Sequence, residues 1–322
     1  MKVIRATPRG RLGWKRPVAA IGIFDGVHRG HQAILSRAVR RARAIGGTPV
    51  ALTFFPHPLA VLRPSLCPEP LYSLEERLKQ FEALGIRGVW VLSFTRAFSR
   101  IPPDRFVREF LVGRLGVREV VIGHDFGFGR GRAGTVPLLR ALGRQHGFSV
   151  HRVGPVRSGG RRIASAGLRR LLRAGRVREA ARWLGRPYRV TGTVVRGAGR
   201  GRKLTVPTAN LPKVCGLLPA PGVYAVRSGL SGRLQGGMAN IGFQPTFHRS
   251  AARRRPLLEV HLFGPQPRLT GARLSVAFLE RLRPERRFPS AAALKGQMVR
   301  DARRAGRILG LQGGRQRGRI TP

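Results

Sequence analysis

The first 150 residues alternate short apolar runs with segments of helical periodicity, and this alternation restricts the fold more than any other feature of the chain. One helical segment begins at Ser73 with a capping box, since Glu76 follows three residues on. Apolar runs that read as buried strands cover residues 20–24, 48–55, 88–94 and 117–123. Strands that alternate with helices form a parallel sheet with crossover helices, so we expect an α/β unit with a Rossmann-like sheet.

The second half of the chain has a different pattern. Beyond Gly185, strand-like runs follow one another across Gly and Pro turns, and no long helix occurs until residues 289–309. This pattern is typical of an antiparallel barrel or sandwich. Residues 161–184 read as two short helices joined at Gly175, after a linker at 156–160. The length suggests two domains. We place the two domains at residues 1–184 and 185–310. A basic tail follows at residues 311–322, and we expect it to be disordered.

The charge balance is extreme, with 62 Lys and Arg residues against 14 Asp and Glu residues and a formal net charge of +48. One reading is nucleic-acid binding, because a basic surface gains affinity by releasing condensed counterions. The other reading is compositional drift, because arginine far outnumbers lysine, Ala, Gly and Pro are also abundant, and the basic residues are scattered along the chain. We favour drift and expect only nonspecific attraction of polyanions.

Nothing in the sequence points to a membrane or to an oxidising compartment. No apolar run reaches about 18 residues, the length that a membrane-spanning helix needs. The N-terminus lacks the apolar segment of a secretory signal. Cys67 and Cys215 lie far apart, which excludes a disulfide framework and a cysteine zinc site. We expect a cytoplasmic protein without a membrane partner, and the oligomeric state stays open.

Residues 20–31 read AIGIFDGVHRGH and place His28 and His31 where a strand ends and a helix begins. A helix N-terminus offers unpaired N–H groups and a positive dipole end, so it holds phosphate well. Gly26 and Gly30 let the backbone approach a ligand, and the imidazoles can donate hydrogen bonds as charge builds on phosphorus. The alternatives are an ordinary loop and a zinc site, although no third zinc ligand is evident nearby. We favour a phosphate site.

Two further motifs follow strands of the same sheet, and ligands of such sheets bind beyond the C-terminal strand ends. LTFFPHP (52–58) offers stacking side chains and a rigid proline turn, against which an aromatic ring or a purine can pack. IGHDFGFGRGRAG (122–134) sets Asp125 beside two phenylalanines on a glycine-rich loop, where its carboxylate can accept from a base or ring N–H. The alternative for both is a turn whose phenylalanines belong to the core.

The barrel half carries two candidate sites. GRGRKLTVPTANL (199–211) sets a glycine-rich arch before Thr208 and Asn210, whose oxygens suit phosphate and Mg²⁺. LLEVHLF (257–263) alternates so that Glu259 shares one strand face with His261. A carboxylate at that position can take a proton from a substrate hydroxyl. The alternatives are a plain turn and a solvated strand face.

In this order, the motifs resemble the bifunctional prokaryotic riboflavin kinase/FAD synthetase family over about residues 17–305, including the segments PGVYAV, ANIGFQPTF and LRPERRFPSAAALKGQ. The resemblance implies two ATP-dependent steps on small-molecule substrates. The C-terminal barrel, with its C-terminal helix, would be a riboflavin kinase that phosphorylates riboflavin to FMN. The N-terminal HxGH nucleotidyltransferase domain would join AMP to FMN, giving FAD and pyrophosphate.

The resemblance also implies roles for single residues. His28 and His31 would act in catalysis on the ATP phosphates, and Glu259 would be the base on the ribityl hydroxyl. Thr208 and Asn210 would bind Mg²⁺ or another divalent cation. The flavin pocket would be shaped by Pro56, Pro58, Asp125 and Phe128. The remaining nucleotide- and phosphate-binding residues would be Phe24, Asp25, Gly26, Gly30, Ser165, Arg169, Gly197, Gly201 and Lys203.

The chain departs from the family pattern at several positions. The family usually has a Ser-Ser-Thr-x-Ile/Val-Arg segment that helps to bind triphosphate, whereas residues 164–169 read ASAGLR. Ile23 and Gly127 stand where the family commonly has Asn and Arg, and Thr205-Val206 where it usually has Gly-Phe. If each lost hydroxyl costs about 1 kcal/mol of net binding, adenylylation is expected to slow about 10-fold or more. The kinase residues named above are all present.

Three hypotheses follow. The leading one is a bifunctional flavin-nucleotide enzyme. The second keeps the fold but leaves a riboflavin kinase whose adenylyltransferase activity is weakened or lost. The third is a basic nucleic-acid-binding protein built on the nucleotidyltransferase fold. A transfer-RNA synthetase is disfavoured, because we find no KMSKS-like loop and no anticodon-type domain.

Overall fold

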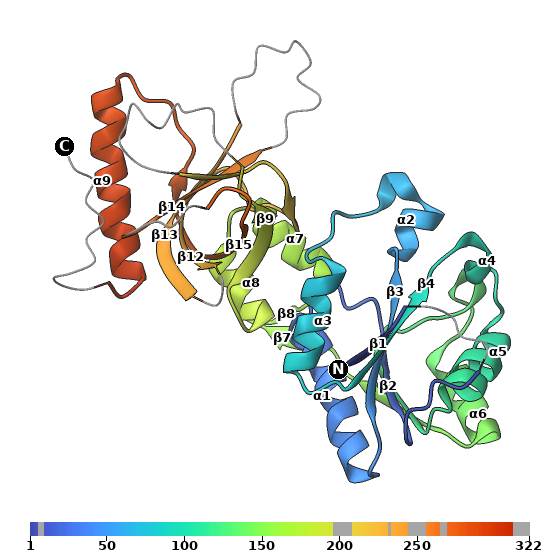
Figure 1. Cartoon of the computed structure of the whole chain (residues 1–322). Helices are drawn as coiled ribbons and strands as arrows, with labels where there is room; N and C mark the ends of the chain where they lie inside the picture. Colours follow the sequence, from blue (N-terminus) through green and yellow to red (C-terminus); the bar gives the residue numbers. More distant parts are fainter. Residues whose placement is uncertain (6–9, 196–207, 231–232, 244–255, 265–268, 312–322) are drawn as a thin grey trace. The chain divides into compact units, whose positions relative to one another are not determined.

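Six parallel strands form the sheet of the N-terminal half, as the alternating pattern predicts (Figure 1). The strand order across the sheet is β1-β4-β3-β2-β5-β6, and every neighbouring pair is parallel. The strands are β1 (Lys2–Ile4), β2 (Val18–Ile21), β3 (Pro49–Phe55), β4 (Gly88–Ser93), β5 (Glu119–Gly123) and β6 (Ser149–Val153). The order changes direction between β2 and β5, which places β2 in the middle of the sheet.

The structure is a computed structural model that describes residues 1–5, 10–195, 208–230, 233–243, 256–264 and 269–311. The chain divides into two compact units, Met1–Ser165 and Ala166–Pro322. Our domain assignment, with its boundary after residue 184, follows sequence character and stays a prediction. The tail that we expect to be disordered lies outside the described residues from residue 312 onward.

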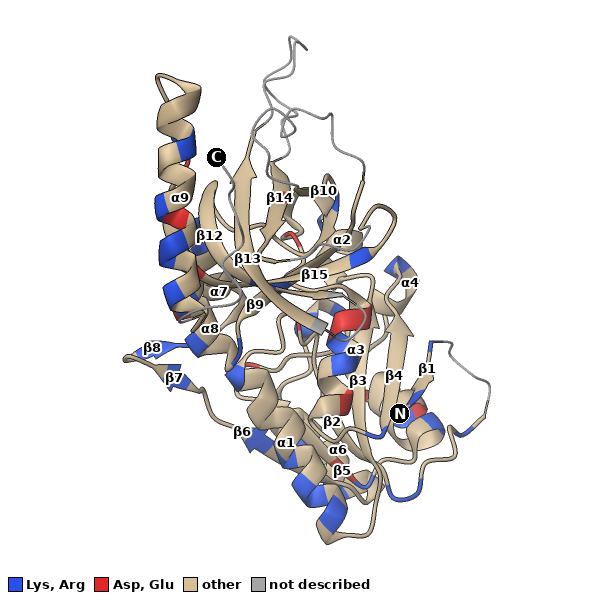
Figure 2. Ribbon diagram, turned by 60° about the vertical axis from the view of Figure 1, so that its left-hand side comes forward, with Lys and Arg blue, Asp and Glu red and all other residues tan. Residues whose placement is uncertain are grey.

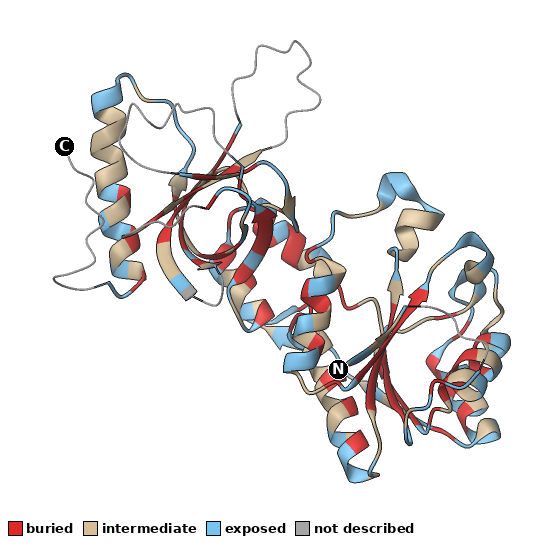
Figure 3. Ribbon diagram, viewed as in Figure 1, coloured by how far each residue is buried: buried red, intermediate tan, exposed pale blue. Residues whose placement is uncertain are grey.

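Helices cover both faces of the parallel sheet, and the strands between them are the most buried part of this unit (Figure 3). Leu35 and Ala38 of α1 and Phe81 of α3 pack against one face. Phe110 of η2 and Leu139 of α6 pack against the other. The helices are α1 (Arg29–Ala44), α2 (Pro58–Leu62), α3 (Leu74–Ala83), α4 (Arg96–Ser99), α5 (Pro103–Phe106) and α6 (Val136–His146), with 3₁₀ turns η1 (Pro64–Leu66) and η3 (Arg130–Arg132) and the π-helix η2 (Val107–Leu115).

Helix α3 begins where its capping residue predicts. The Ser73 hydroxyl accepts the Glu76 N–H at 3.2 Å, which satisfies one of the free donors of the first turn. Helix α5 runs directly into the π-helix η2, which ends at Gly116 in a left-handed conformation. A left-handed residue after the last turn is a common helix stop, and glycine adopts it without a Cβ clash.

Two features differ from the sequence prediction. The N-terminal strand β1 pairs with β4 at the edge of the sheet, although its three residues are too few to show a strand pattern in the sequence. Residues 156–160 do not form a plain linker, because β7 (Arg157–Ser158) pairs with β8 (Arg161–Arg162) in a short antiparallel hairpin. Gly159 and Gly160 form its turn with φ angles of 55° and 73°, which glycine adopts without strain.

The second unit is a nearly closed antiparallel barrel. Its seven strands follow the order β10-β14-β13-β12-β15-β9-β11. The chain just after β9 meets β10, because Val195 bridges to Asn210 and its N–H donates to the Asn210 carbonyl at 2.9 Å. This contact joins the two sides of the sheet into a barrel. The strands are β9 (Tyr188–Thr193), β10 (Ala209–Leu211), β11 (Val214–Cys215), β12 (Gly222–Leu230), β13 (Arg233–Gly242), β14 (Leu257–Leu262) and β15 (Arg273–Pro284).

The described residues of this half of the chain include three helices. The two short helices predicted around Gly175 are α7 (Ser165–Arg173) and α8 (Val177–Leu184). The last helix, α9 (Ala291–Ile308), lies within the range expected for it. Its residue Ala305 packs with Ala225 and Met238 on the outer face of the barrel. No helix in the described ranges is both long enough and apolar enough to cross a membrane.

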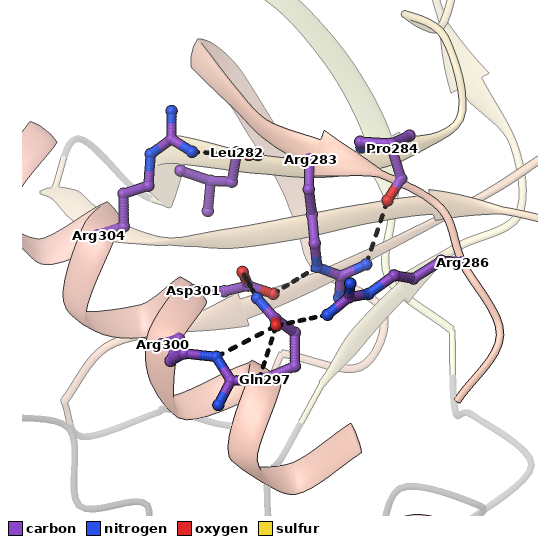
Figure 4. Close-up of polar contacts among 8 residues, drawn as sticks. All are labelled: Leu282, Arg283, Pro284, Arg286, Gln297, Arg300, Asp301 and Arg304. Atoms are coloured by element: carbon purple, nitrogen blue, oxygen red, sulfur yellow. Dashed lines mark hydrogen bonds and ion pairs between the residues drawn. The ribbon is translucent and has the colours of Figure 1, made fainter. Parts of the chain in front are cut away.

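A polar network fixes α9 to the end of β15 (Figure 4). Asp301 is buried and accepts from Arg283 Nε and from Gln297 Nε2, both at 2.8 Å. The Gln297 carbonyl oxygen in turn accepts from Arg286 Nη2 at 2.6 Å and from Arg300 Nη2 at 2.9 Å. The network therefore spans the connector between strand and helix, with one guanidinium on the Asp301 carboxylate and two more on the Gln297 amide oxygen.

Candidate active sites

Three of the predicted motifs meet at one edge of the parallel sheet. Strands β3, β2 and β5 are neighbours, and they run in the same direction. The loops that begin after Ile21, Phe55 and Gly123 therefore leave the sheet from the same edge, as the sequence predicts. This edge is the first candidate site.

The two histidines of the HxGH motif form one unit at the start of α1. His28 is the N-cap residue, and its Nδ1 accepts the His31 N–H at 3.2 Å. The rings stack with their centroids 3.6 Å apart and an interplanar angle of 16°. A Cβ at Gly30 would lie only 3.1 Å from the His28 ring, so glycine leaves room for this stack. The arrangement presents imidazole groups at a helix end that attracts anions.

The loop before these histidines is tightly wound. Phe24 and Val27 have φ angles of 54° and 40°, a region that side-chain-bearing residues adopt rarely and at a cost. Gly26, at 89°, adopts it freely. Phe24 is fully buried and meets the His31 ring edge-on at 5.4 Å. Packing thus holds the strained loop, and the loop sets the positions of the His28 and His31 imidazoles.

The environment of His31 keeps its imidazole neutral. Burial lowers the pKa of His31 well below its usual value, and the nearby His28 and Arg77 lower it further. His31 Nδ1 is buried and has no hydrogen-bond partner within the described residues. The imidazole of His31 is therefore held in its neutral form.

Asp25 is turned into the protein. It is buried, and its Oδ1 accepts the Leu71 N–H at 3.0 Å. Its backbone carbonyl accepts the Ser165 hydroxyl at 2.8 Å. The ASAGLR segment is thereby tied to the histidine loop through Ser165, whereas Arg169 is buried in α7 and belongs to the other compact unit. Their predicted roles toward a nucleotide stay predictions.

The predicted flavin residues fall into two groups. Pro56 is exposed, Pro58 is the first residue of α2, and Asp125 is exposed and pairs with Arg162 of the β7–β8 hairpin. Phe128 is instead 7% exposed, and it stacks on Phe126 at 5.6 Å within the hydrophobic core. The packing of Phe128 agrees with the alternative in which the phenylalanines of this loop belong to the core. A contact between Phe128 and a flavin stays a prediction.

The second candidate site is a polar row on the barrel. Three side chains occupy directly paired positions on neighbouring strands, Asn210 on β10, Glu259 on β14 and Asn240 on β13. Paired residues in an antiparallel sheet share a face, so these side chains are neighbours. Leu258, which is fully buried, points to the opposite face, and the alternation expected for residues 257–263 is confirmed.

The surroundings of Glu259 raise the pKa of its carboxyl group. Burial raises the pKa of its carboxyl, the hydrogen bond with Asn240 lowers it, and the neighbouring Glu285 raises it. A side chain at Gly242 would collide with the Glu285 carboxylate and lie 3.3 Å from Asn240 Nδ2, so glycine lets this second carboxylate approach the row. The net rise makes Glu259 a better proton acceptor.

The donors of this site suit a hard cation. Thr208 is exposed and lies two residues before Asn210, which pairs with Glu259 across the β10–β14 ladder. Oxygen ligands of this kind fit Mg²⁺. The described residues hold no group of three or more His, Cys, Asp and Glu side chains placed for a metal. Three predicted phosphate-binding residues lie outside the described residues, Gly197, Gly201 and Lys203.

Comparison with known proteins decides the family. The FAD synthetase model matches residues 12–167, and the riboflavin kinase model matches residues 184–309. Curated bifunctional riboflavin kinase/FMN adenylyltransferases match over nearly their whole length. The Escherichia coli K12 protein is 36% identical over 91% of this chain and 93% of its own, and the Bacillus subtilis protein 34% over 90% and 92%. This chain belongs to the bifunctional riboflavin kinase/FMN adenylyltransferase family.

A solved structure supports the family fold. The structure described as a macrolide-efflux protein from Streptococcus pneumoniae has a TM-score of 0.82 and 26% sequence identity, and it covers 94% of this chain and 98% of that one. The Pseudomonas fluorescens relative is 37% identical over 92% of this chain and 94% of its own. The two-part fold expected from the motifs is therefore confirmed.

Neighbouring side chains occupy the space beside Gly127, a family departure, and beside Gly167, which stands at the unrestricted position of the family's Ser-Ser-Thr-x-Ile/Val-Arg segment. A Cβ at Gly127 would lie 3.2 Å from Arg132 Nε, and Arg132 Nη2 donates to the Asp125 carbonyl at 3.0 Å. A guanidinium is thus present beside Gly127, where the family commonly has Arg. At Gly167 a Cβ would collide with the Trp183 ring, so this indole fills the space that a larger residue would need.

Sequence reasoning missed three residues of these sites. Asn240 lies in the segment ANIGFQPTF, but the sequence alone does not show that β13 pairs with β14 and brings Asn240 beside Glu259. Arg162 pairs with Asp125 across 37 residues. Arg77 reads as one more charge on an amphipathic helix, although it is buried and contacts the histidine loop. Each becomes visible only when distant elements are brought together.

Proposed function

We propose that this chain makes FMN from riboflavin and then FAD from FMN. The observation that carries the proposal is that one chain matches both family models, and each matched region holds its own cluster of reactive side chains. ATP and flavins are the substrates that both activities imply. The cytoplasm is the compartment that we propose for the reaction.

In the kinase step, Glu259 would accept the proton of the riboflavin 5′-hydroxyl as its oxygen attacks the γ-phosphorus of ATP and ADP leaves. Asn240 would orient the carboxylate, since it hydrogen-bonds Glu259. Thr208 and Asn210 would hold Mg²⁺, which neutralises phosphate charge when bound. The glycine-rich arch with Gly197, Gly201 and Lys203 would cover the phosphates.

In the adenylyltransferase step, a phosphate oxygen of FMN attacks the α-phosphorus of ATP and pyrophosphate leaves. His28 and His31 would hydrogen-bond the phosphate oxygens as negative charge builds on them. The dipole of the 16-residue α1 adds to this stabilisation. Pro56, Pro58, Asp125 and Phe128 would shape the flavin pocket, and Ser165 and Arg169 would complete the nucleotide site with Phe24, Asp25, Gly26 and Gly30.

A second candidate is a riboflavin kinase with weak or absent adenylyltransferase activity. One observation favours it. Ser165 carries the one hydroxyl left in residues 164–166, and this hydroxyl already donates to the Asp25 carbonyl. Fewer hydroxyl donors therefore remain for a triphosphate in this chain than in the family's usual segment.

A product assay separates the two candidates. Purified protein is given riboflavin, ATP and Mg²⁺, and FMN and FAD are followed by chromatography. Sustained FAD formation supports the bifunctional enzyme, whereas FMN that accumulates without FAD leaves only the kinase. Glu259→Ala should abolish FMN formation and spare adenylylation of supplied FMN, and His28→Ala should do the reverse. Equal loss of both activities in either variant would contradict this division of labour.

A further inference from the structure

Arg77 is a buried cation behind the histidine loop. It lies on α3 one turn before Phe81, whose ring packs in the same core cluster as Leu35 and Ala38 of α1. Its exposed fraction is 7%, which is rare for arginine. Phe81 packs edge-on against Phe24 at 5.5 Å. Helix α3 therefore brings an aromatic ring and a guanidinium to the same short loop.

The guanidinium holds the loop at the point where its strained segment begins. Arg77 Nη1 donates to the Ile23 carbonyl at 2.7 Å, and the buried Thr53 hydroxyl donates to the same oxygen at 3.2 Å. The next residue, Phe24, is the first of the left-handed residues in the loop. Strained backbone persists when its surroundings over-determine it. Two donors on one carbonyl are such a restraint.

The charge of Arg77 is only partly compensated. Burial lowers the pKa of Arg77, and the nearby Asp25 opposes that shift. Arg77 Nε is buried without a hydrogen-bond partner within the described part of the chain. The same cation lowers the pKa of His31, together with burial and His28. A positive charge thus stands behind the imidazoles, in a place where water screens it weakly.

We propose that Arg77 is a positioning residue of the adenylyltransferase site, which holds the loop of residues 22–28 in the shape that presents His28 and His31 to the ATP phosphates. The inference rests on the proposed function of this site. Arg77 touches no reacting atom, because it acts through the Ile23 carbonyl. Its charge contributes a long-range attraction for the triphosphate, and it adds to burial and His28 in lowering the pKa of His31.

Four proteins test this role: the wild type, R77Q, R77K and K79Q. Lys79 is the matched control, because it lies on the same helix with a side chain that is 70% exposed. FMN adenylylation is measured against ATP concentration, and riboflavin phosphorylation by the same preparation reports on folding. The midpoint of the His31 titration is measured by NMR without substrate.

R77Q should lower kcat/KM for ATP in adenylylation by about 10- to 100-fold, while its kinase activity stays within about two-fold of the wild type. The His31 midpoint should rise, since a nearby cation is lost. R77K keeps the charge but not the fork geometry, so its His31 midpoint should stay near the wild-type value while adenylylation falls.

The proposal is overturned if R77Q matches K79Q in adenylylation. It is also overturned if R77Q loses both activities equally while R77K has wild-type values of both, since Arg77 is then needed only for folding. A wild-type protein that makes no FAD refutes the proposed function instead. In that case the inference falls with the proposed function, whereas a wild-type protein that makes FAD and an R77Q variant that matches K79Q refute the inference alone.

Discussion

Glu259 combines two demands that oppose each other. A base must lose its proton to act, yet burial makes the charged form unfavourable and raises its pKa. The carboxylate is the active form, so FMN formation should fall as the pH drops through a midpoint above the ordinary glutamate value of 4.5. The pH profile of kcat for riboflavin phosphorylation measures this limb. A limb at or below the ordinary value would argue against Glu259 as the base.

Glu259 is also expected to lower the free energy of unfolding at neutral pH. Since the folded protein binds the Glu259 proton more tightly than the unfolded chain does, stability falls as the pH rises from the ordinary value through the folded-state pKa. Glu259→Gln should therefore be at least as stable as the wild type at neutral pH, although its kinase activity falls about 100-fold or more. Urea unfolding at pH 7 compares the two proteins.

Gly30 gives a second prediction at this scale. In a helix, Gly→Ala usually stabilises by about 0.5–1 kcal/mol. At Gly30 the new methyl would press on the His28 ring, so Gly30→Ala should not stabilise and should lower adenylylation about 10-fold. Gly306→Ala is the control, because a Cβ there meets nothing within 4 Å. Thermal unfolding and FAD formation of both variants test the contrast, and equal behaviour would contradict it.

At the scale of the element, the docking of α9 depends on one buried ion pair. The side chains of Arg283 and Asp301 are 15% and 7% exposed. Asp301→Ala leaves Arg283 without this carboxylate, which should cost about 2–4 kcal/mol of unfolding free energy. Arg300→Gln removes an exposed member of the same network (Figure 4) and should cost less than about 1 kcal/mol. Urea unfolding measures both, and a loss in Asp301→Ala no larger than in Arg300→Gln would contradict the assignment.

Elements and motif loops could be predicted because their signals are local. The Ser73 cap, the strand-to-helix step at His28 and the alternation around Glu259 each lie within a few residues. The β7–β8 hairpin was missed because Gly-Gly between basic residues also reads as a linker. Arg77 was missed because the sequence does not show which distant elements pack over a charged residue on an amphipathic helix and bury it.

At the scale of the whole molecule, the net charge of +48 predicts one property besides catalysis, the nonspecific binding of polyanions. Lys and Arg lie on many elements of both units, including α1, α8 and α9 (Figure 2). Scattered charge attracts polyanions without selecting a sequence, and the attraction falls steeply with salt. Binding to unstructured and structured RNA should be equal at low salt and should weaken by about 10-fold or more between 50 and 200 mM salt. Filter binding tests this, and salt-resistant or selective binding would favour the nucleic-acid hypothesis.

The contact between Val195 and Asn210 has a consequence for dynamics. This contact closes the barrel, and one of its two residues, Asn210, is also a proposed cation ligand. Ligand binding and opening of the barrel are therefore linked, and occupancy should slow solvent deuterium uptake at the Val195 amide, whose bond to the Asn210 carbonyl must break for exchange.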